Sequence, residues 1–398
     1  MMSSPKSSPM EIYVHIPFCI KKCDYCDFLS GPSGPKEQEA YVKALLGEIN
    51  AVTEGTGRSV SSIFIGGGTP SVLDENFIGD ILKTIRTKFS IQADAEITIE
   101  VNPGTADDRK LQVYRKYGIN RLSIGLQSPD DRELKILGRI HNYDQFLRTY
   151  HSARKAGFDN INIDLMSAIP DQTYEGWIRN LRTAAELKPE HISAYSLIIE
   201  EETPFAMRHL NLPDEDTEYE MYEATARILR EYGFEQYEIS NYAQKDRECR
   251  HNIGYWTRQD YLGFGLGAAS LYGKERFANT ADRKKYQENS TRPELIREKE
   301  PTLTTEDEMA EFMFLGLRMI RGNPISRSRL FTRWVSPDWV YPTTSDALEK
   351  LPRSTAVIKI SNFFASINTL PCFPFSCFSG ISAVSHSFRL FTEYYTLS

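Results

Sequence analysis

Three of the six cysteines in the chain lie within eight residues, at Cys19, Cys23 and Cys26, in the spacing C-x3-C-x2-C. Thiolates are soft ligands that favour zinc, copper(I) or iron–sulfur clusters. A structural zinc ion takes four ligands, commonly in two closely spaced pairs, and no fourth cysteine lies near this group. Three thiolates suit a 4Fe–4S cubane whose remaining iron can bind a small molecule. The alternatives are a zinc site completed from a distant part of the chain and three buried thiols that only pack.

The composition is that of a globular protein. The 398 residues are enough for one large α/β domain and a smaller one. The net charge of −7 argues against a surface that follows nucleic-acid phosphates. No long apolar run predicts a transmembrane segment, which leaves peripheral membrane contact open. Clustered thiols suit a reducing compartment, so we expect a cytoplasmic protein.

Six predicted strands alternate with helices in the first half of the chain. Every polar or glycine-rich stretch in this region follows a strand, at the end where parallel α/β barrels place their sites. We therefore expect an open six-unit parallel (β/α) barrel with right-handed crossovers. The expected strands are 11–16, 60–65, 95–101, 121–126, 160–166 and 191–199, and the expected helices are 37–52, 74–89 with Asp74 as N-cap, 107–117, 130–137, 143–156 and 174–187.

The pattern changes beyond residue 200. We expect a helix over 216–232, a strand over 235–239, a glycine-rich turn at 263–267 that closes the barrel edge, and an amphipathic helix over 305–321 with a capping box from Thr305 to Glu308. The predicted organisation is a disordered leader (1–10), the barrel (11–200), a smaller α+β domain (201–350) and an atypical tail rich in Ser, Phe and Pro (351–398).

The cysteine motif after a short apolar strand resembles the signature of radical S-adenosylmethionine (radical SAM) proteins. In that superfamily the open iron binds the amino and carboxylate groups of S-adenosylmethionine, and one electron from the cluster cleaves the sulfonium. Six further stretches narrow the resemblance to the anaerobic coproporphyrinogen III oxidase-like family. They are YVHIPFC, FIGGGTPS, IEVNPG, RLSIGLQS, NIDLMSAIPDQT and HISAYSLIIE, and the match covers roughly residues 11–320.

This resemblance implies that Cys19, Cys23 and Cys26 bind the cluster. It also implies a set of S-adenosylmethionine contacts after the strands. Taken alone, each of these polar residues equally suits a cap or a surface position, and the glycine run suits a tight turn. The ligand offers an ammonium, a carboxylate and hydroxyls, so acidic, amide and guanidinium groups each have a partner. The implied contacts are Tyr13, Tyr25, Gly67, Gly68, Thr69, Glu100, Gln127, Arg139 and Asp164.

Two departures point to the HemW branch of the family. Phe28 stands where the porphyrinogen-oxidising enzymes have a further cysteine, and their long N-terminal arm is missing. The branch implies a haem chaperone that passes haem to an acceptor protein, whose identity the sequence does not give. His251, in an H-N-x-x-Y-W motif, is the implied haem contact, because histidine can ligate haem iron. The alternative interpretation of His251 is a core histidine. The other histidine near a motif, His15, is interpreted as structural.

Two other functions stay open at this point. One is an oxygen-independent coproporphyrinogen III oxidase, which would decarboxylate its substrate oxidatively. The other is a zinc- or cluster-bearing binding protein. The residues also leave open whether S-adenosylmethionine is cleaved, so enzymatic activity is not assigned.

Overall fold

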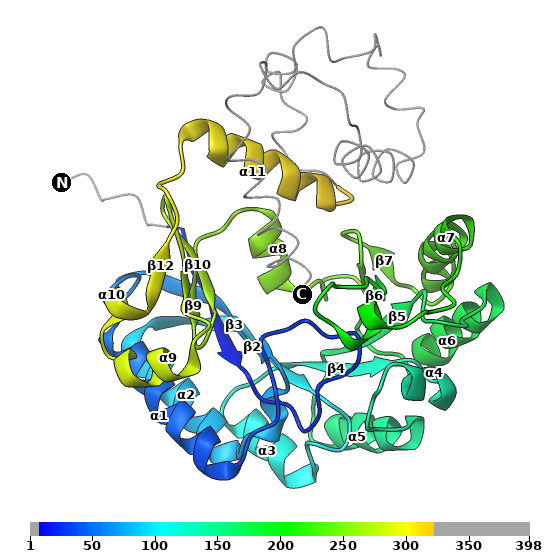
Figure 1. Cartoon of the computed structure of the whole chain (residues 1–398), viewed down its shortest axis with the longest axis horizontal. Helices are drawn as coiled ribbons and strands as arrows, with labels where there is room; N and C mark the ends of the chain where they lie inside the picture. Colours follow the sequence, from blue (N-terminus) through cyan, green and yellow to red (C-terminus); the bar gives the residue numbers. More distant parts are fainter. Residues whose placement is uncertain (1–7, 322–398) are drawn as a thin grey trace, which may run out of the picture. The chain divides into compact units, whose positions relative to one another are not determined.

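The computed structural model describes residues 8–321, and one sheet of twelve strands runs through it (Figure 1). Its centre is six parallel strands that lie side by side in chain order. This arrangement confirms the expected open six-unit barrel. The strands are β1 (Met10–Ile16), β2 (Ser59–Gly67), β3 (Ser90–Val101), β4 (Arg121–Gln127), β5 (Ile161–Ser167) and β6 (His191–Ser196).

Helices follow these strands and cover the outer side of the sheet (Figure 1). Asp74 accepts a hydrogen bond from the Asn76 amide and caps α2, as predicted. The helices are α1 (Pro35–Ala51), α2 (Glu75–Lys88), α3 (Asp108–Lys116), α4 (Asp131–Ile136), α5 (Tyr143–Lys155) and α6 (Tyr174–Glu186), with short 3₁₀ turns η1 (Pro70–Val72) and η2 (Pro204–Met207).

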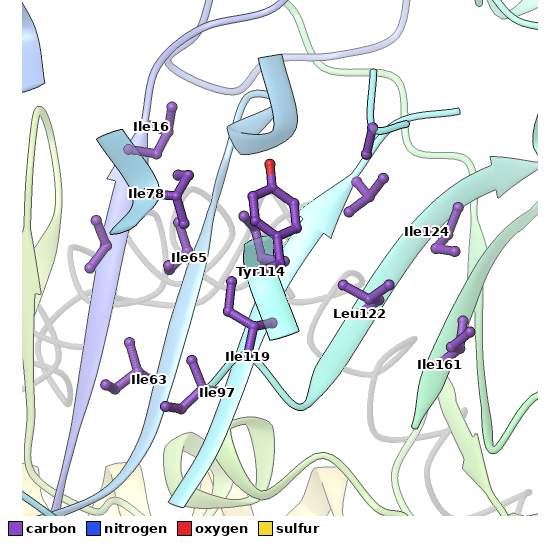
Figure 2. Packing of buried hydrophobic residues seen from close by; sticks show 14 of the residues in the cluster. Ile16, Ile63, Ile65, Ile78, Ile97, Tyr114, Ile119, Leu122, Ile124 and Ile161 are labelled. Carbon is purple, nitrogen blue, oxygen red and sulfur yellow. The ribbon is translucent and has the colours of Figure 1, made fainter. Parts of the chain in front are cut away.

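The two faces of the sheet differ in chemistry. The face toward the helices is apolar, and Figure 2 shows its side chains, such as Ile65, Ile97 and Leu122, packed in one cluster. Alternate residues of the same strands point the other way. On β1 these are Glu11, Tyr13 and His15, so the inner face of the barrel is polar and can carry a site.

Short strands extend the barrel at both edges. Beyond β6 lie β8 (Asn241–Ala243) and β7 (Glu235–Gln236), so the strand expected over 235–239 is shorter than predicted. Beyond β1 lies β9 (Tyr261–Phe264), which pairs with it in parallel. The antiparallel strands β10 (Ala269–Tyr272), β11 (Glu275–Asn279) and β12 (Arg297–Lys299) follow, together with the helices α9 (Arg283–Asn289) and α10 (Pro293–Ile296).

A buried carboxylate holds the glycine-rich turn after β9 in place. Glu48, on α1, accepts hydrogen bonds from the Gly265 amide (2.9 Å), Asn279 Nδ2 (2.6 Å) and the Tyr286 hydroxyl (2.5 Å). Burial raises the pKa of Glu48 to about 7. These contacts join the turn to the β1 edge of the barrel, which is the position predicted for it.

The described residues form two compact units. The first comprises residues up to Gln236 with Ser240–Gly254 and Gln259–Leu303, and the second comprises Tyr237–Ile239, Tyr255–Arg258 and the residues from Thr304 on. This division differs from the expected boundary near residue 200, because β9 from the later segment pairs with β1.

Within the second unit, α11 (Thr305–Arg318) begins at a capping box. The box is formed by Thr304 and Asp307 and not by Thr305 and Glu308, so the predicted pair was wrong by one residue. Arg258 joins this helix through ion pairs to Glu311 (2.8 Å) and Glu308 (3.3 Å).

Of the predicted leader, Met10 is a buried residue of β1. The tail predicted for 351–398 lies outside the described residues. Within residues 8–321, every helix is too short or too polar to span a bilayer.

Candidate functional site

The loop after β1 carries the three cysteines and is anchored by backbone hydrogen bonds at several points. The Cys19 amide donates to the Gly31 carbonyl (3.0 Å), which closes the base of the loop. The Thr69 amide donates to the Phe18 carbonyl (2.7 Å), and the Asp24 amide donates to the Leu137 carbonyl (3.2 Å). The loop is therefore held by the segments that follow β2 and β4, as well as by its own ends.

Each of the three thiols receives one hydrogen bond. The Thr69 hydroxyl donates to Cys19 Sγ (3.6 Å), and Arg139 Nη1 donates to Cys23 Sγ (3.7 Å). The backbone amide of Phe28 donates to Cys26, whose thiol pKa burial raises to about 12. Donors aimed at sulfur stabilise thiolates, so this arrangement suits sulfurs that carry negative charge.

Two glycines let the chain pass close to this loop. A Cβ at Gly68 would lie 2.7 Å from the Phe18 carbonyl oxygen and 3.0 Å from Cys19 Sγ. Gly67 has φ +112°, and a Cβ there would lie 2.6 Å from the His15 ring. The predicted glycine contacts therefore lie directly against the cysteine loop, where backbone groups can reach a ligand.

His15 holds the far side of the loop. Its Nε2–H donates to the Leu29 carbonyl (3.0 Å), so Nδ1 accepts from the Tyr13 hydroxyl (3.1 Å). Burial lowers the pKa of His15, which favours the neutral ring. These contacts support the structural role expected for His15. Tyr13 contributes to holding the loop through its hydrogen bond to His15.

Acidic and amide groups gather on the inner face above these residues. Glu100 Oε2 accepts from the Gly67 amide (3.0 Å), and burial together with the nearby Asp164 raises the pKa of Glu100 to about 8. Asp164 accepts from Asn162 Nδ2 (2.7 Å) and from Ser123 (3.1 Å), and its pKa is also raised by burial. Two buried carboxyl groups near each other create a site that favours a cation.

A cleft of about 290 Å³, counting the part open to solvent, lies beside Cys23, Thr69 and Arg139. Ile20 and Ile140 are about half exposed at its edge, at 56% and 50%. Four polar lining residues, like these two isoleucines, were not predicted as site residues from the sequence. They are Lys21, Asn102, Thr105 and His141.

Three buried polar atoms around this region have no hydrogen-bond partner within the described residues. They are Gln127 Oε1, Arg139 Nε and His141 Nε2. Gln127 Oε1 can only accept, Arg139 Nε can only donate, and His141 Nε2 donates or accepts according to its tautomer, so together they suit a ligand with both donors and acceptors. Burial, followed by the charge of Arg139, lowers the pKa of His141 to about 3, which keeps its ring neutral.

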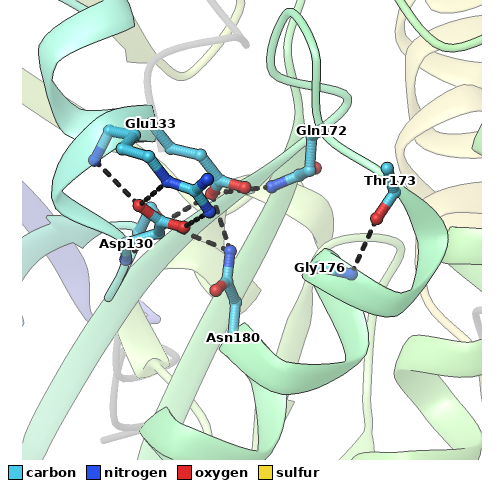
Figure 3. Close-up of polar contacts among 8 residues, drawn as sticks. Asp130, Glu133, Gln172, Thr173, Gly176 and Asn180 are labelled. Carbon is cyan, nitrogen blue, oxygen red and sulfur yellow. Dashed lines mark hydrogen bonds and ion pairs between the residues drawn. The ribbon is translucent and has the colours of Figure 1, made fainter.

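Arg139 reaches the site because helix α4 is held by a buried carboxylate. Glu133 Oε2 accepts from Ser128 Oγ (2.6 Å), Asn180 Nδ2 (2.7 Å) and Gln172 Nε2 (3.0 Å), as Figure 3 shows for the last two. These bonds join α4 to α6 and to the loop before it. Arg139 follows α4 by three residues, so its position depends on this network.

Replacing Glu133 with alanine is expected to lower the free energy of unfolding by about 3 kcal/mol, because three buried donors lose their acceptor. Chemical denaturation of the unliganded protein measures this loss. Glu175→Ala removes an exposed carboxylate on α6 and serves as the control, with an expected change near zero. Equal stability of the two variants would contradict the role of Glu133.

Comparison with known proteins identifies the family. The profile of the Radical SAM superfamily matches residues 13–184. "Heme chaperone HemW" of Escherichia coli (strain K12) is 42% identical over 274 residues, which cover 68% of this chain and 72% of that protein. The protein of the same name from Bacillus subtilis (strain 168) is 36% identical over 352 residues, covering 85% of this chain and 91% of its own. The chain belongs to the HemW family of radical SAM proteins.

A solved structure has a fold similar to that of this chain. Coproporphyrinogen III oxidase (HemN) from Escherichia coli, described as a radical SAM enzyme, superposes with a TM-score of 0.69 at 28% identity. The match covers 78% of this chain and 75% of that one. The open barrel is therefore shared with HemN, as the sequence motifs predicted.

Membership of the radical SAM superfamily implies a 4Fe–4S cluster and S-adenosylmethionine, and the residues fit both. Three thiols with one donor each suit a cluster ligated through three sulfurs. The unpartnered polar atoms and paired carboxyl groups suit a ligand that is cationic and polar. Within residues 8–321, no three His, Cys, Asp or Glu side chains surround a point that one metal ion could occupy.

The structure does not bring His251 to this cleft. His251, on α8 (Arg250–Trp256), lies near the opposite ends of the strands, where its Nδ1 lies 2.8 Å from the Ser62 hydroxyl and 3.8 Å from Glu11 Oε2. Its ring stacks on Phe64, is 1% exposed, and has a pKa lowered to about 3 by burial and the charge of Arg121. In the described conformation His251 is thus a neutral core histidine.

Proposed function

We propose that this protein is a haem chaperone that binds a 4Fe–4S cluster, S-adenosylmethionine and haem, and transfers haem to an acceptor protein. Its membership of the HemW family carries the proposal, since two relatives named as haem chaperones align with it at 42% and 36% identity. Phe28 adds support, because its side chain offers no thiolate at the position where the porphyrinogen-oxidising enzymes have a further cysteine.

We propose the following roles for the chain's own residues. Cys19, Cys23 and Cys26 would bind three irons, while Glu100 and Asp164 would attract the positive charge of S-adenosylmethionine. Further contacts with the cofactor would come from Gly67, Gly68, Thr69, Gln127, Arg139, Tyr13 and Tyr25. When bound, the 4Fe–4S cluster and S-adenosylmethionine together can supply a one-electron cleavage of the sulfonium.

We retain His251 as the proposed haem contact. Its neutral ring is the form that ligates haem iron. Since the ring is only 1% exposed, ligation requires that helix α8 rearrange to admit the porphyrin. Helix α8 has seven residues, so such a change would involve few backbone hydrogen bonds.

A haem titration followed by absorbance tests the proposal. We expect the wild-type protein to saturate with a shifted Soret band, and His251→Ala to weaken binding by at least about tenfold, the effect of roughly 1.4 kcal/mol. His209→Ala removes an exposed histidine and should leave binding unchanged. Thermal unfolding of each variant shows whether the buried substitution has disturbed the fold. If neither wild type nor His251→Ala perturbs the Soret band, the chaperone function is refuted.

Oxygen-independent coproporphyrinogen III oxidase is the second candidate, because the HemN structure is similar over most of the chain. An anaerobic assay with reconstituted cluster, S-adenosylmethionine and a reductant separates the two functions. We expect no protoporphyrinogen, and its formation would favour the oxidase.

A cytoplasmic location fits the oxidation-sensitive thiols that this function needs. The acceptor would be a haem-dependent protein, reached in solution or at a membrane surface. Fractionation of cells that express the full chain tests both expectations.

A further inference from the structure

Asn102 lies between the two donors that reach the cluster cysteines. It directly follows β3, and its side-chain amide bridges the segments after β2 and β4. Asn102 Nδ2 donates to Thr69 Oγ1 (2.7 Å), while its Oδ1 accepts from Arg139 Nη2 (2.8 Å). The five residues Cys19, Thr69, Asn102, Arg139 and Cys23 thus form one continuous hydrogen-bonded chain.

The direction of every bond in this chain follows from Asn102. Its amide cannot be flipped, because that would place NH₂ against the guanidinium and leave the Thr69 hydroxyl without a donor. Since the Thr69 oxygen accepts from Asn102, its single hydrogen is directed at Cys19 Sγ. Arg139 Nη2 is occupied by Asn102 and by the Gly125 carbonyl (2.9 Å), which turns Nη1 toward Cys23 Sγ.

The backbone of Asn102 is itself restrained. Its amide donates to Ser71 Oγ (3.2 Å), and its carbonyl accepts from the Thr105 hydroxyl (2.6 Å) and amide (3.1 Å). The Ser71 and Thr105 hydroxyls contact each other at 2.5 Å. The side-chain amide is therefore presented in one orientation before any ligand is bound.

We propose that Asn102 is a positioning residue that directs one hydrogen bond onto each of two cluster cysteines and thereby raises the reduction potential of the cluster. The inference rests on cluster binding at Cys19, Cys23 and Cys26, and not on haem transfer. Hydrogen bonds to the sulfurs are a main determinant of cluster potential. A donor near sulfur stabilises the more negative, reduced cluster, so losing it makes reduction harder.

The test is an anaerobic redox titration of the reconstituted full-length protein, monitored by electron paramagnetic resonance without S-adenosylmethionine. We expect Asn102→Ala and Thr69→Val each to shift the redox equilibrium toward the oxidised cluster by about tenfold, or about 59 mV for one electron. Because Asn102 acts in part through Thr69, the double variant should shift by less than the sum of the single shifts.

Asn120→Ala is the matched control. Asn120 directly precedes β4, near the other end of the strands. Its side chain donates to the Ala95 carbonyl (2.8 Å) and accepts from the Ile97 amide (2.8 Å), both on β3. It should change stability without changing the potential. Iron content is measured on every sample. If Asn102→Ala fails to load iron, Thr69→Val decides, since it exchanges only a hydroxyl for a methyl. The proposal is overturned if the iron-loaded Asn102→Ala and Thr69→Val proteins have the same cluster reduction potential as Asn120→Ala.

Discussion

Cys23→Ser is expected to lose nearly all of its iron, from about four irons per chain in the reconstituted wild type to close to none. A serine oxygen is a poor ligand for iron–sulfur clusters, and only three thiols are present in the loop. The change also replaces the sulfur that accepts from Arg139 Nη1 with a hydroxyl oxygen. Iron and sulfide analysis after anaerobic reconstitution measures the loss.

Cys249→Ser provides the control for this experiment. Cys249 is fully buried near the opposite ends of the strands, 3.5 Å from Glu96 Oε1. Its replacement should leave the iron content at the wild-type value. Wild-type iron in Cys23→Ser, or equal loss in both variants, would contradict the assignment of the cluster to this loop.

The affinity for S-adenosylmethionine is expected to fall about tenfold for each pH unit below about 8, over the range in which Glu100 holds its proton. Burial and Asp164 raise the pKa of Glu100 to about 8, and a cationic ligand binds best to the ionised carboxylate. Binding below that pH therefore releases a proton. Calorimetry of the cluster-loaded protein in buffers of different ionisation enthalpy measures both the affinity and the proton.

Glu100→Gln should bind weakly at every pH and show no slope. The free energy of unfolding of the unliganded protein has the opposite pH dependence. Folded Glu100 holds its proton more tightly than Glu100 in the unfolded chain, whose pKa is the ordinary 4.5. Its contribution to stability is thus present at low pH and is lost as the pH rises from about 4.5 through about 8. A pH-independent affinity in the wild type would exclude Glu100 from the cation site.

The barrel could be predicted because its strands carry a strong local pattern. In β1, the apolar residues Ile12 and Val14 alternate with Glu11, Tyr13 and His15. The helices that follow β2, β3, β4 and β5 each begin at a side-chain cap. The errors lie where the local signal is short or duplicated. Adjacent threonines offered two equivalent capping boxes before α11, and only packing selects the one at Thr304. The pairing of β9 with β1 joins segments about 250 residues apart, which no local pattern encodes.

The site shows a similar limit. The cysteines and the glycines were predictable because their spacing is local. Asn102 was not, since its importance comes from lying between Thr69 and Arg139, which meet only in the folded sheet. His251 was singled out by its motif, but its burial against Ser62 and Phe64 depends on tertiary structure.

The anchoring of the cysteine loop has a consequence for how iron is acquired. In small zinc modules the metal supplies the free energy of folding, and the chain is unfolded without it. Here the backbone around Cys19 is already closed by Gly31 and Thr69, so the entropy of ordering the loop is lost when the barrel folds. The cluster then assembles at a site whose backbone is already ordered. The free energy of the iron–sulfur bonds therefore stabilises the bound metal and does not have to offset the ordering of the loop.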